Sequence, residues 1–236
     1  VLTPYVAFNH TYGNLSHPYY RLERMQEWSD ALDWTKGSLG ILPDGEWQAI
    51  CFDNENSYYS KEKKQTGSVG MRLSHKLTGL KRGNIQFDAD LGAVLQYKHL
   101  DYQRNEQSYD IDRHAYSFRP TLTMEYRSNG KHKWSPELRL NYTGKQQLPN
   151  LLNMLQIEDY ADPLNLFRGN ASLQGEYAHR LALRYGMSQR KTRHDMYLSL
   201  QYTRTHNNIV ASSIYNTENG GRIYEMVNTN RTHEAN

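Results

Sequence analysis

The sequence lacks long hydrophobic runs, and it has little net charge and a single cysteine. No segment approaches the eighteen or more consecutive apolar residues of a helical membrane span, and the mean hydropathy is −0.88. Cys51 alone excludes an intrachain disulfide framework, and a formal net charge of +3 over 236 residues is too small to indicate nucleic-acid binding. These absences do not exclude a β-barrel membrane protein, because every second residue of its strands is polar.

The common catalytic motifs are missing as well. There is no G-x-S-x-G, H-E-x-x-H, Walker loop or C-x-x-C, and the ten histidines are scattered without the spacing of metal ligands. Asp53-x-Glu55-x-Ser57 is only faintly similar to a calcium loop, because Tyr58 stands where the turn glycine should be. We therefore expect no enzyme activity, no metal site and no cofactor.

What the chain does have is strict alternation of apolar and polar residues in segments that carry an aromatic residue near each end. It is clearest over residues 85–98, 116–126 and 134–142. The apolar members are Ile85, Phe87, Ala89, Leu91, Ala93, Leu95, Tyr97, Tyr116, Phe118, Pro120, Leu122, Met124, Tyr126, Trp134, Pro136, Leu138, Leu140 and Tyr142. A period of two places them on one face of a β-strand.

The length of these segments matches the depth of a membrane. From Tyr116 to Tyr126, at roughly 3.3 Å per residue and a tilt near 40°, the chain rises about 25 Å along the membrane normal. The lipid-facing band of an outer-membrane barrel has about that height, with aromatic girdles at both interfaces. A soluble β-sandwich explains the alternation but gives no reason for aromatic residues at both ends. We predict an all-β fold, an antiparallel up-and-down transmembrane β-barrel.

The pattern predicts eight strands, with turns that alternate between short and long. The expected strands are 1–12, 66–76, 84–98, 114–127, 133–143, 176–188, 194–214 and 222–230. The short turns are 77–83, 128–132 and 189–193, and the long loops are 13–65, 99–113 and 144–175. Short turns on one rim and long loops on the other are typical of outer-membrane barrels.

Register and strand ends are predicted in two places. If Tyr126 faces Trp134 across the Ser128-Asn129-Gly130 turn, Leu122 meets Leu138 and the polar faces pair as well. The segment 194–214 is interpreted as one strand projecting beyond the rim. The alternative is a tight turn at 206–208 followed by a separate strand.

The polar strand faces and the longest loop supply the candidate functional residues. The residues expected to face the barrel lumen are Asp88, Asp90, Arg119, Glu125, Glu137, Arg139, Arg180 and Arg184. The aromatic residues in or beside loop 13–65 are Tyr19, Tyr20, Trp28, Trp34, Trp47, Tyr58 and Tyr59. These rings either stack on a ligand or form the loop's own small core, and a short amphipathic helix is expected over 19–34.

One stretch resembles a known family. Its motifs are Pro149-Asn150-Leu151-Leu152, Asp162-Pro163-Leu164-Asn165, Gly169-Asn170-Ala171-Ser172-Leu173-Gln174-Gly175-Glu176-Tyr177 and Leu181-Ala182-Leu183-Arg184-Tyr185. They resemble the barrel of TonB-dependent outer-membrane receptors, especially those of Bacteroidetes, although Ala171 and Gly175 replace prolines that are frequent there. Asp53-Asn54-Glu55-Asn56-Ser57-Tyr58-Tyr59-Ser60 is similar to the same group.

The resemblance implies a barrel of about 22 strands in the bacterial outer membrane, plugged by an amino-terminal domain. It also implies import of a scarce ligand (a siderophore, a metal chelate, a glycan or a peptide) energised by a TonB-type protein. Lipid, the plug and the TonB-type protein would then be the partners. We expect the whole of residues 1–236 to be part of one barrel domain, with the plug and the last strands outside it.

Two other functions stay open at this point. A small non-transporting adhesin or structural barrel predicts that eight strands close on themselves. An outer-membrane hydrolase needs a catalytic cluster at the outer rim, and neither His114 nor His179 has an identifiable partner in the sequence.

Overall fold

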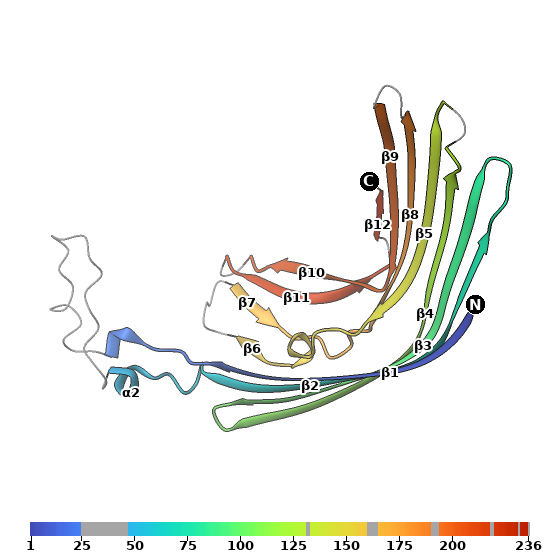
Figure 1. Cartoon of the computed structure of the whole chain (residues 1–236). Coiled ribbons are helices and arrows are strands. Elements are labelled where there is room, and N and C mark those ends of the chain that lie inside the picture. Colours follow the sequence, from blue (N-terminus) through green and yellow to red (C-terminus); the bar gives the residue numbers. More distant parts are fainter. Residues whose placement is uncertain are drawn as a thin grey trace.

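The computed structural model describes residues 1–24, 47–130, 133–159, 165–189, 194–217, 220–230 and 232–235. One long, antiparallel, eight-stranded sheet dominates these residues and bends into an open trough (Figure 1). In spatial order its strands are β1 (Leu2–His17), β2 (Tyr58–Leu77), β3 (Gly83–Arg104), β4 (Gln107–Ser128), β5 (Ser135–Gln147), β8 (Glu176–Gln189), β9 (His194–His206) and β12 (Thr232–Ala235). The edge strands β1 and β12 do not pair, so the sheet does not close.

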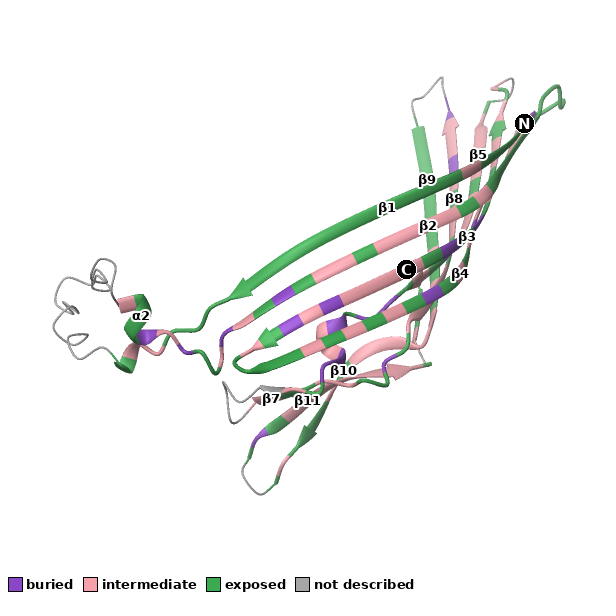
Figure 2. Ribbon diagram, turned by 90° about the horizontal axis from the view of Figure 1, so that it is seen from below, coloured by how far each residue is buried: buried purple, intermediate pink, exposed green. Residues whose placement is uncertain are grey.

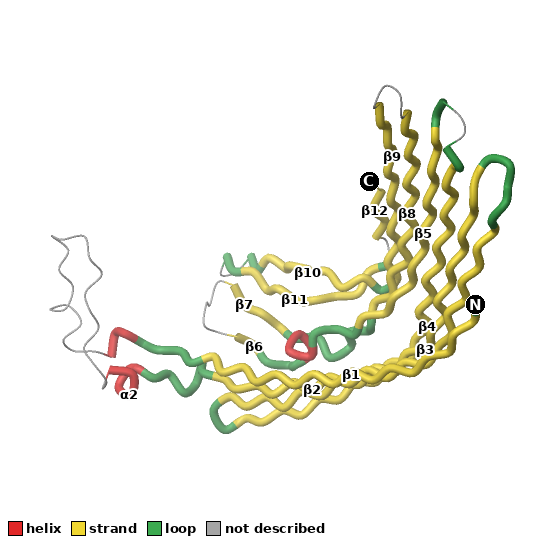
Figure 3. The backbone as a smooth tube through the Cα atoms, in the orientation of Figure 1, coloured by secondary structure: helices red, strands yellow, loops and turns green. Residues whose placement is uncertain are grey.

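A second, smaller sheet lies inside the trough. Its strand order is β10 (Asn208–Tyr215), β11 (Arg222–Thr229), β7 (Asn165–Arg168) and β6 (Glu158–Asp159), as Figure 3 shows. The helical elements in the ranges given above are the short α2 (Trp47–Cys51) and the 3-10 turns η1 (Leu22–Arg24) and η3 (Leu151–Met154). Among the described residues, no helix has the length and apolarity to cross a membrane.

The convex face of the large sheet is apolar along its middle, and the strand register produces this. Leu91 lies opposite Met71 on one side and Pro120 on the other, and Leu183 lies opposite Leu140 and Leu200. These side chains are not covered by protein: Leu91 is 45% and Leu200 49% exposed. A continuous exposed apolar surface of this kind requires an apolar environment.

The concave face of the same sheet is polar. It is identified by contacts with the point where the chain leaves β5 and enters the trough, because Gln96 and Lys98 donate hydrogen bonds to the carbonyls of Gln146, at the end of β5, and of Pro149, just after it. Asp88 and Asp90 alternate in step with these two residues, so they share that face. Alternation therefore sorts the side chains as the sequence predicts, apolar outward and polar inward.

This polarity reverses where the strands continue past Tyr97, which lies opposite His114. Beyond this pair the convex face carries His99 and Asp101, whereas the concave face carries Leu100 and Tyr102, which are 2% and 5% exposed. The convex apolar band therefore ends at Tyr97. Above it the strands behave like those of a water-soluble protein, with an internal core.

The long loops are shorter than predicted, because the strands run on beyond the membrane depth. The prediction of a loop over 99–113 is wrong, because β3 and β4 continue to a tight turn in which Asn105 has φ 52°. β1 reaches His17 and β2 begins at Tyr58, so loop 13–65 shrinks to residues 18–57. Figure 2 shows that β1 is exposed along almost its whole length.

The predicted register between β4 and β5 is wrong by four residues. Tyr126 faces Leu138, not Trp134, and Leu122 faces Tyr142. The shift is even, so each residue keeps its face. At the same rim, two bonds link the end of β4 to the turn before β3: Asn129 donates its side-chain amide to the carbonyl of Lys81, and the Tyr126 hydroxyl donates to that of Arg82.

The predicted single strand over 194–214 is also wrong, and the alternative is correct. β9 ends at His206, Asn207 turns the chain with φ 53°, and β10 begins at Asn208 in the second sheet. The segment 222–230 was expected to be the eighth wall strand, but β11 belongs to the small sheet. The short β12 pairs with β9 in its place.

Candidate functional site

The site is built where the small sheet and the loop before it meet the concave face beyond Tyr97. Leu100 and Tyr102 of β3 pack with Leu151, Met154 and Leu155 of the loop, and Leu173 completes this buried cluster. Ile209 of β10 and Met226 of β11 pack against it. The cluster fixes the small sheet to the wall.

Asparagine side chains add a second attachment. Asn228 of β11 donates to the carbonyls of Gln174 and Asn207, at 3.0 and 2.7 Å, and its own oxygen accepts the Gln174 amide. Asn170 donates to the Met226 carbonyl at 3.0 Å. These bonds satisfy backbone groups that sheet pairing leaves over at the point where the chain leaves the wall.

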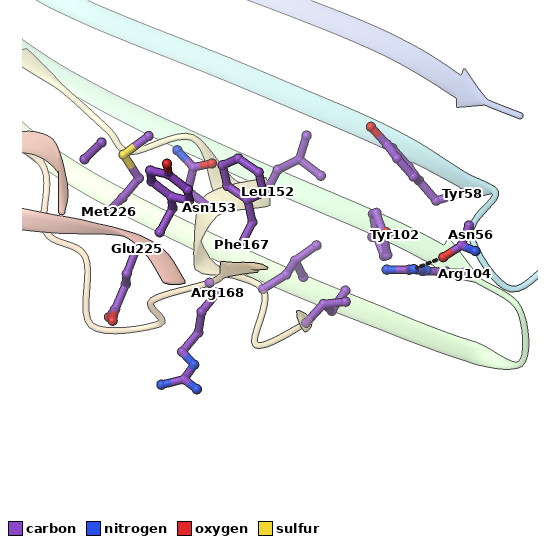
Figure 4. A pocket seen from close by; sticks show the side chains of 15 residues that line it. Asn56, Tyr58, Tyr102, Arg104, Leu152, Asn153, Phe167, Arg168, Glu225 and Met226 are labelled. Atoms are coloured by element: carbon purple, nitrogen blue, oxygen red, sulfur yellow. Dashed lines mark hydrogen bonds between the residues drawn. The ribbon is translucent and has the colours of Figure 1, made fainter. Parts of the chain in front are cut away.

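A cavity of about 220 Å³ lies between the two sheets at this junction (Figure 4). Tyr58 and Tyr102 come from the wall, and Phe167 and Tyr224 come from the small sheet. The other lining residues are Asn56, Arg104, Leu152, Asn153, Leu155, Ile157, Arg168, Gly169, Ala211, Glu225 and Met226. Rings, guanidinium groups, amides and a carboxylate thus surround a single space.

The aromatic residues of the cavity are held by ring contacts. Tyr58 stacks between His17 and Tyr102, with centroid separations of 5.2 Å on both sides. Across the cavity Phe167 and Tyr224 stack at 5.3 Å. Because the rings are fixed in advance, a ligand that stacks on them loses little side-chain freedom of the protein.

Arg104 connects the cavity to the loop between β1 and β2. It donates to the Glu55 carbonyl at 2.7 Å and to the side-chain oxygen of Asn56 at 2.8 Å, the bond drawn in Figure 4. Its charge therefore lies at the cavity wall, and its position depends on this loop.

The base of that loop is held by Asp53, which is 2% exposed. Its carboxylate accepts hydrogen bonds from Arg21 at 2.8 Å and from Asn56 at 2.5 Å. Burial opposes ionisation, but these bonds and the Arg21 charge outweigh it, so the pKa of Asp53 lies below its ordinary value. In the segment Asp53-x-Glu55-x-Ser57, which is faintly similar to a calcium loop, the Asp53 carboxylate is thus bound by Arg21.

The eight residues predicted to face the lumen all lie on the concave face, as their register shows. Glu125 and Arg139 form an ion pair at 3.3 Å. Asp90 accepts hydrogen bonds from Tyr5 at 2.7 Å and Arg72 at 3.0 Å. That this face borders a water-filled lumen stays a prediction.

The predicted aromatic candidates do not gather in one place. Tyr58 lines the cavity, whereas the next residue, Tyr59, points to the convex face. Tyr20 lies near Trp47 at 5.3 Å in the loop's own small cluster, and Tyr19 stacks on His17 at 5.3 Å. Trp28 and Trp34, with most of the helix expected over 19–34, lie outside the described residues; residues 22–24 form a 3-10 turn.

Sequence reasoning missed the half of the cavity that the small sheet supplies. Tyr224 and Met226 lie in the segment 222–230, which the sequence predicts as a wall strand, and Phe167 and Arg168 lie in the predicted loop 144–175. The available signal was the Asn207-Asn208 pair, which favours a turn and a new strand.

Comparison with known proteins agrees with this architecture. Residues 78–236 match the model of the "Outer membrane protein beta-barrel family". None of the curated proteins matches the sequence. Among solved structures, the chain is similar to a double mutant of the Serratia marcescens hemophore receptor HasR in complex with its hemophore HasA and heme. The identity is 14%, over 75% of this chain and 39% of that chain, with a TM-score of 0.42.

Proposed function

The chain belongs to the outer membrane protein beta-barrel family of the bacterial outer membrane, and we propose that it forms part of the wall of a TonB-dependent receptor importing a scarce ligand. It spans less than half of the receptor chain to which it is similar, so the activity concerns a larger protein. We propose no catalytic role. The plug domain and the TonB-type protein are the proposed partners.

The main support is that eight strands leave the sheet open. A small structural barrel of eight strands would pair its first and last strands, but β1 and β12 lie at opposite edges. A polar concave face on an open sheet fits the wall of a wider barrel.

The cavity supports a ligand-binding role at the loop-rich end, which faces the outside of the cell in outer-membrane barrels. Its stacked rings offer apolar contact, and Arg104, Arg168 and Glu225 offer charged groups. A siderophore, another metal chelate, a glycan or a peptide presents complementary groups to such a surface.

The test uses the full-length gene in its own host. A deletion strain is complemented with the wild type, with Tyr58→Ala, or with Tyr59→Ala as the matched control on the opposite face. Growth is measured with ferric chelates, peptides or glycans as the limiting nutrient, and again in a strain without its TonB-type protein.

We expect one nutrient to fail in both the deletion and the TonB-deficient strain. Tyr58→Ala should require about fivefold more of that nutrient, because stacking of a ligand on one ring contributes on the order of 1 kcal/mol. Tyr59→Ala should grow as the wild type does. A surface-exposed protein whose deletion affects no nutrient would instead favour the non-transporting adhesin or structural barrel.

A further inference from the structure

Away from the cavity, three side chains with metal-binding atoms meet on the convex face of the β3–β4 hairpin. Nδ1 of His99 lies 3.1 Å from Oδ1 of Asp112 and 3.3 Å from Oδ1 of Asp110. All three atoms lie within 4.8 Å of one another, the only such group of three within the described ranges. None of them takes part in the function proposed above.

The strand register, not a flexible loop, brings these groups together. His99 is directly opposite Asp112, and Asp110 is the next residue of β4 on the same face. β3 and β4 pair with each other both before and after this point in the hairpin, so the backbone distances between the two strands are fixed. Only the side-chain torsions are left to adjust.

The three groups are not balanced as an ordinary ion pair. One imidazole nitrogen faces two carboxylate oxygens, and it can donate at most one proton to them. A third carboxylate, Asp101, lies directly opposite Asp110, an arrangement of like charges that destabilises a strand pair. The nearby Lys61 and Lys63 form no ion pair with these carboxylates in the described part of the chain.

The separations fit a bound cation. Ligand atoms in a tetrahedral zinc site, with bonds of about 2.0–2.2 Å, lie roughly 3.4 Å apart. The two distances from His99 are close to this value, and Asp110, with a side chain 70% exposed, is free to rotate inward.

A supporting hydrogen bond is also in place. The Tyr97 hydroxyl donates to Oδ1 of Asp112 at 2.7 Å. Carboxylates that bind metals are usually oriented by such a bond from a neighbouring residue.

We propose that His99, Asp110 and Asp112 bind one divalent cation of the zinc class on the outer surface of the barrel, immediately beyond the apolar band. An imidazole nitrogen with two carboxylates suits Zn²⁺, Ni²⁺ or Cu²⁺, whereas Mg²⁺ and Ca²⁺ prefer oxygen ligands alone. Water completes the coordination. The ion neutralises the facing carboxylates and holds the β3–β4 pair at the membrane edge.

The test is a Zn²⁺ titration of the full-length protein in detergent, without a histidine tag and after treatment with a chelator. A competing zinc dye reports affinity, and Co²⁺ absorption in the visible range reports coordination. His99→Ala and the isosteric Asp112→Asn should each remove one equivalent or weaken it at least tenfold. Tyr97→Phe should weaken it about tenfold.

The matched control is His75→Ala, which removes an exposed histidine from the same face at the other end of β2. It should leave the titration unchanged. Circular dichroism establishes that each variant retains its sheet. Equal zinc binding by the wild type and both His99→Ala and Asp112→Asn would overturn the proposal, and so would binding of Ca²⁺ or Mg²⁺ without Zn²⁺.

Discussion

A charge placed on either face of β8 tests the membrane orientation of the whole sheet. Leu183 lies in the convex row between Leu140 and Leu200, whereas the adjacent Ala182 lies on the concave face between Asn141 and Gln201. Leu183→Arg puts a guanidinium into lipid near mid-depth, at a cost of about 2–4 kcal/mol. Ala182→Arg puts the same group beside an open depression of about 570 Å³ and should cost less than about 1 kcal/mol.

The two variants share a strand, a neighbour and a new side chain, so their difference isolates the face. At about 1.4 kcal/mol per tenfold change, Leu183→Arg should reduce the folding equilibrium constant roughly 30- to 800-fold relative to wild type. The assay is urea titration of the full-length protein refolding into lipid vesicles, followed by tryptophan fluorescence. Equal losses for both variants, or a larger loss for Ala182→Arg, would refute a lipid-facing convex surface.

Three further predictions concern the loop-rich end and use limited proteolysis of the full-length protein in membranes. Asp53→Asn should expose the loop to cleavage at neutral pH, and unchanged cleavage of this variant would contradict the Arg21 contact. In the wild type, the stabilisation from ionised Asp53 is complete above its ordinary pKa of 3.8 and is lost as pH falls through its lowered folded-state pKa. Gly169→Ala should loosen the small sheet, because an added Cβ would lie 1.5 Å from the Leu155 carbonyl oxygen; retained protease resistance would show that the backbone can shift. Asn228→Ala should destabilise the same sheet by about 1–3 kcal/mol, measured as faster cleavage of β10–β11, and a rate equal to wild type would mean that water replaces its bonds.

The face of each wall residue could be predicted from sequence because side-chain alternation is a local property. Even the register error between β4 and β5 left Leu122 and Leu138 on the convex side, since the shift of four residues is an even number. The register itself was not predictable. It depends on how β4, β5 and β8 pair along their whole length across the sheet, which no local pattern records.

The strand ends were underestimated for a related reason. Each predicted strand is defined by one apolar face, and the apolar face changes sides at Tyr97. Residues such as Leu100 and Tyr102 therefore fell in the opposite phase and were assigned to a loop. The physical cause is a change of surroundings along a single strand: the apolar convex band ends at Tyr97, and the concave face changes there from polar side chains to a packed core.

The cavity required information that the sequence does not carry locally. β10 and β11 are short and do not alternate strictly, since Ile209 and Val210 are adjacent, as are Met226 and Val227, and nothing in their local sequence says whether they join the wall or the small sheet. Their placement follows from the turn at Asn207 and from long-range contacts with Leu151 and Leu100. Within the described ranges, Tyr58 is the one predicted aromatic residue that lines the cavity together with this sheet.

The change of polarity at Tyr97 and His114 also sets how high the sheet stands in the bilayer. If the barrel sank by one residue pair, His99 and Asp112 would be dragged into hydrocarbon, and if it rose by the same amount, Leu95 would be lifted into water. Either displacement is uphill. The vertical position of this wall is therefore encoded in the side chains of its own strands.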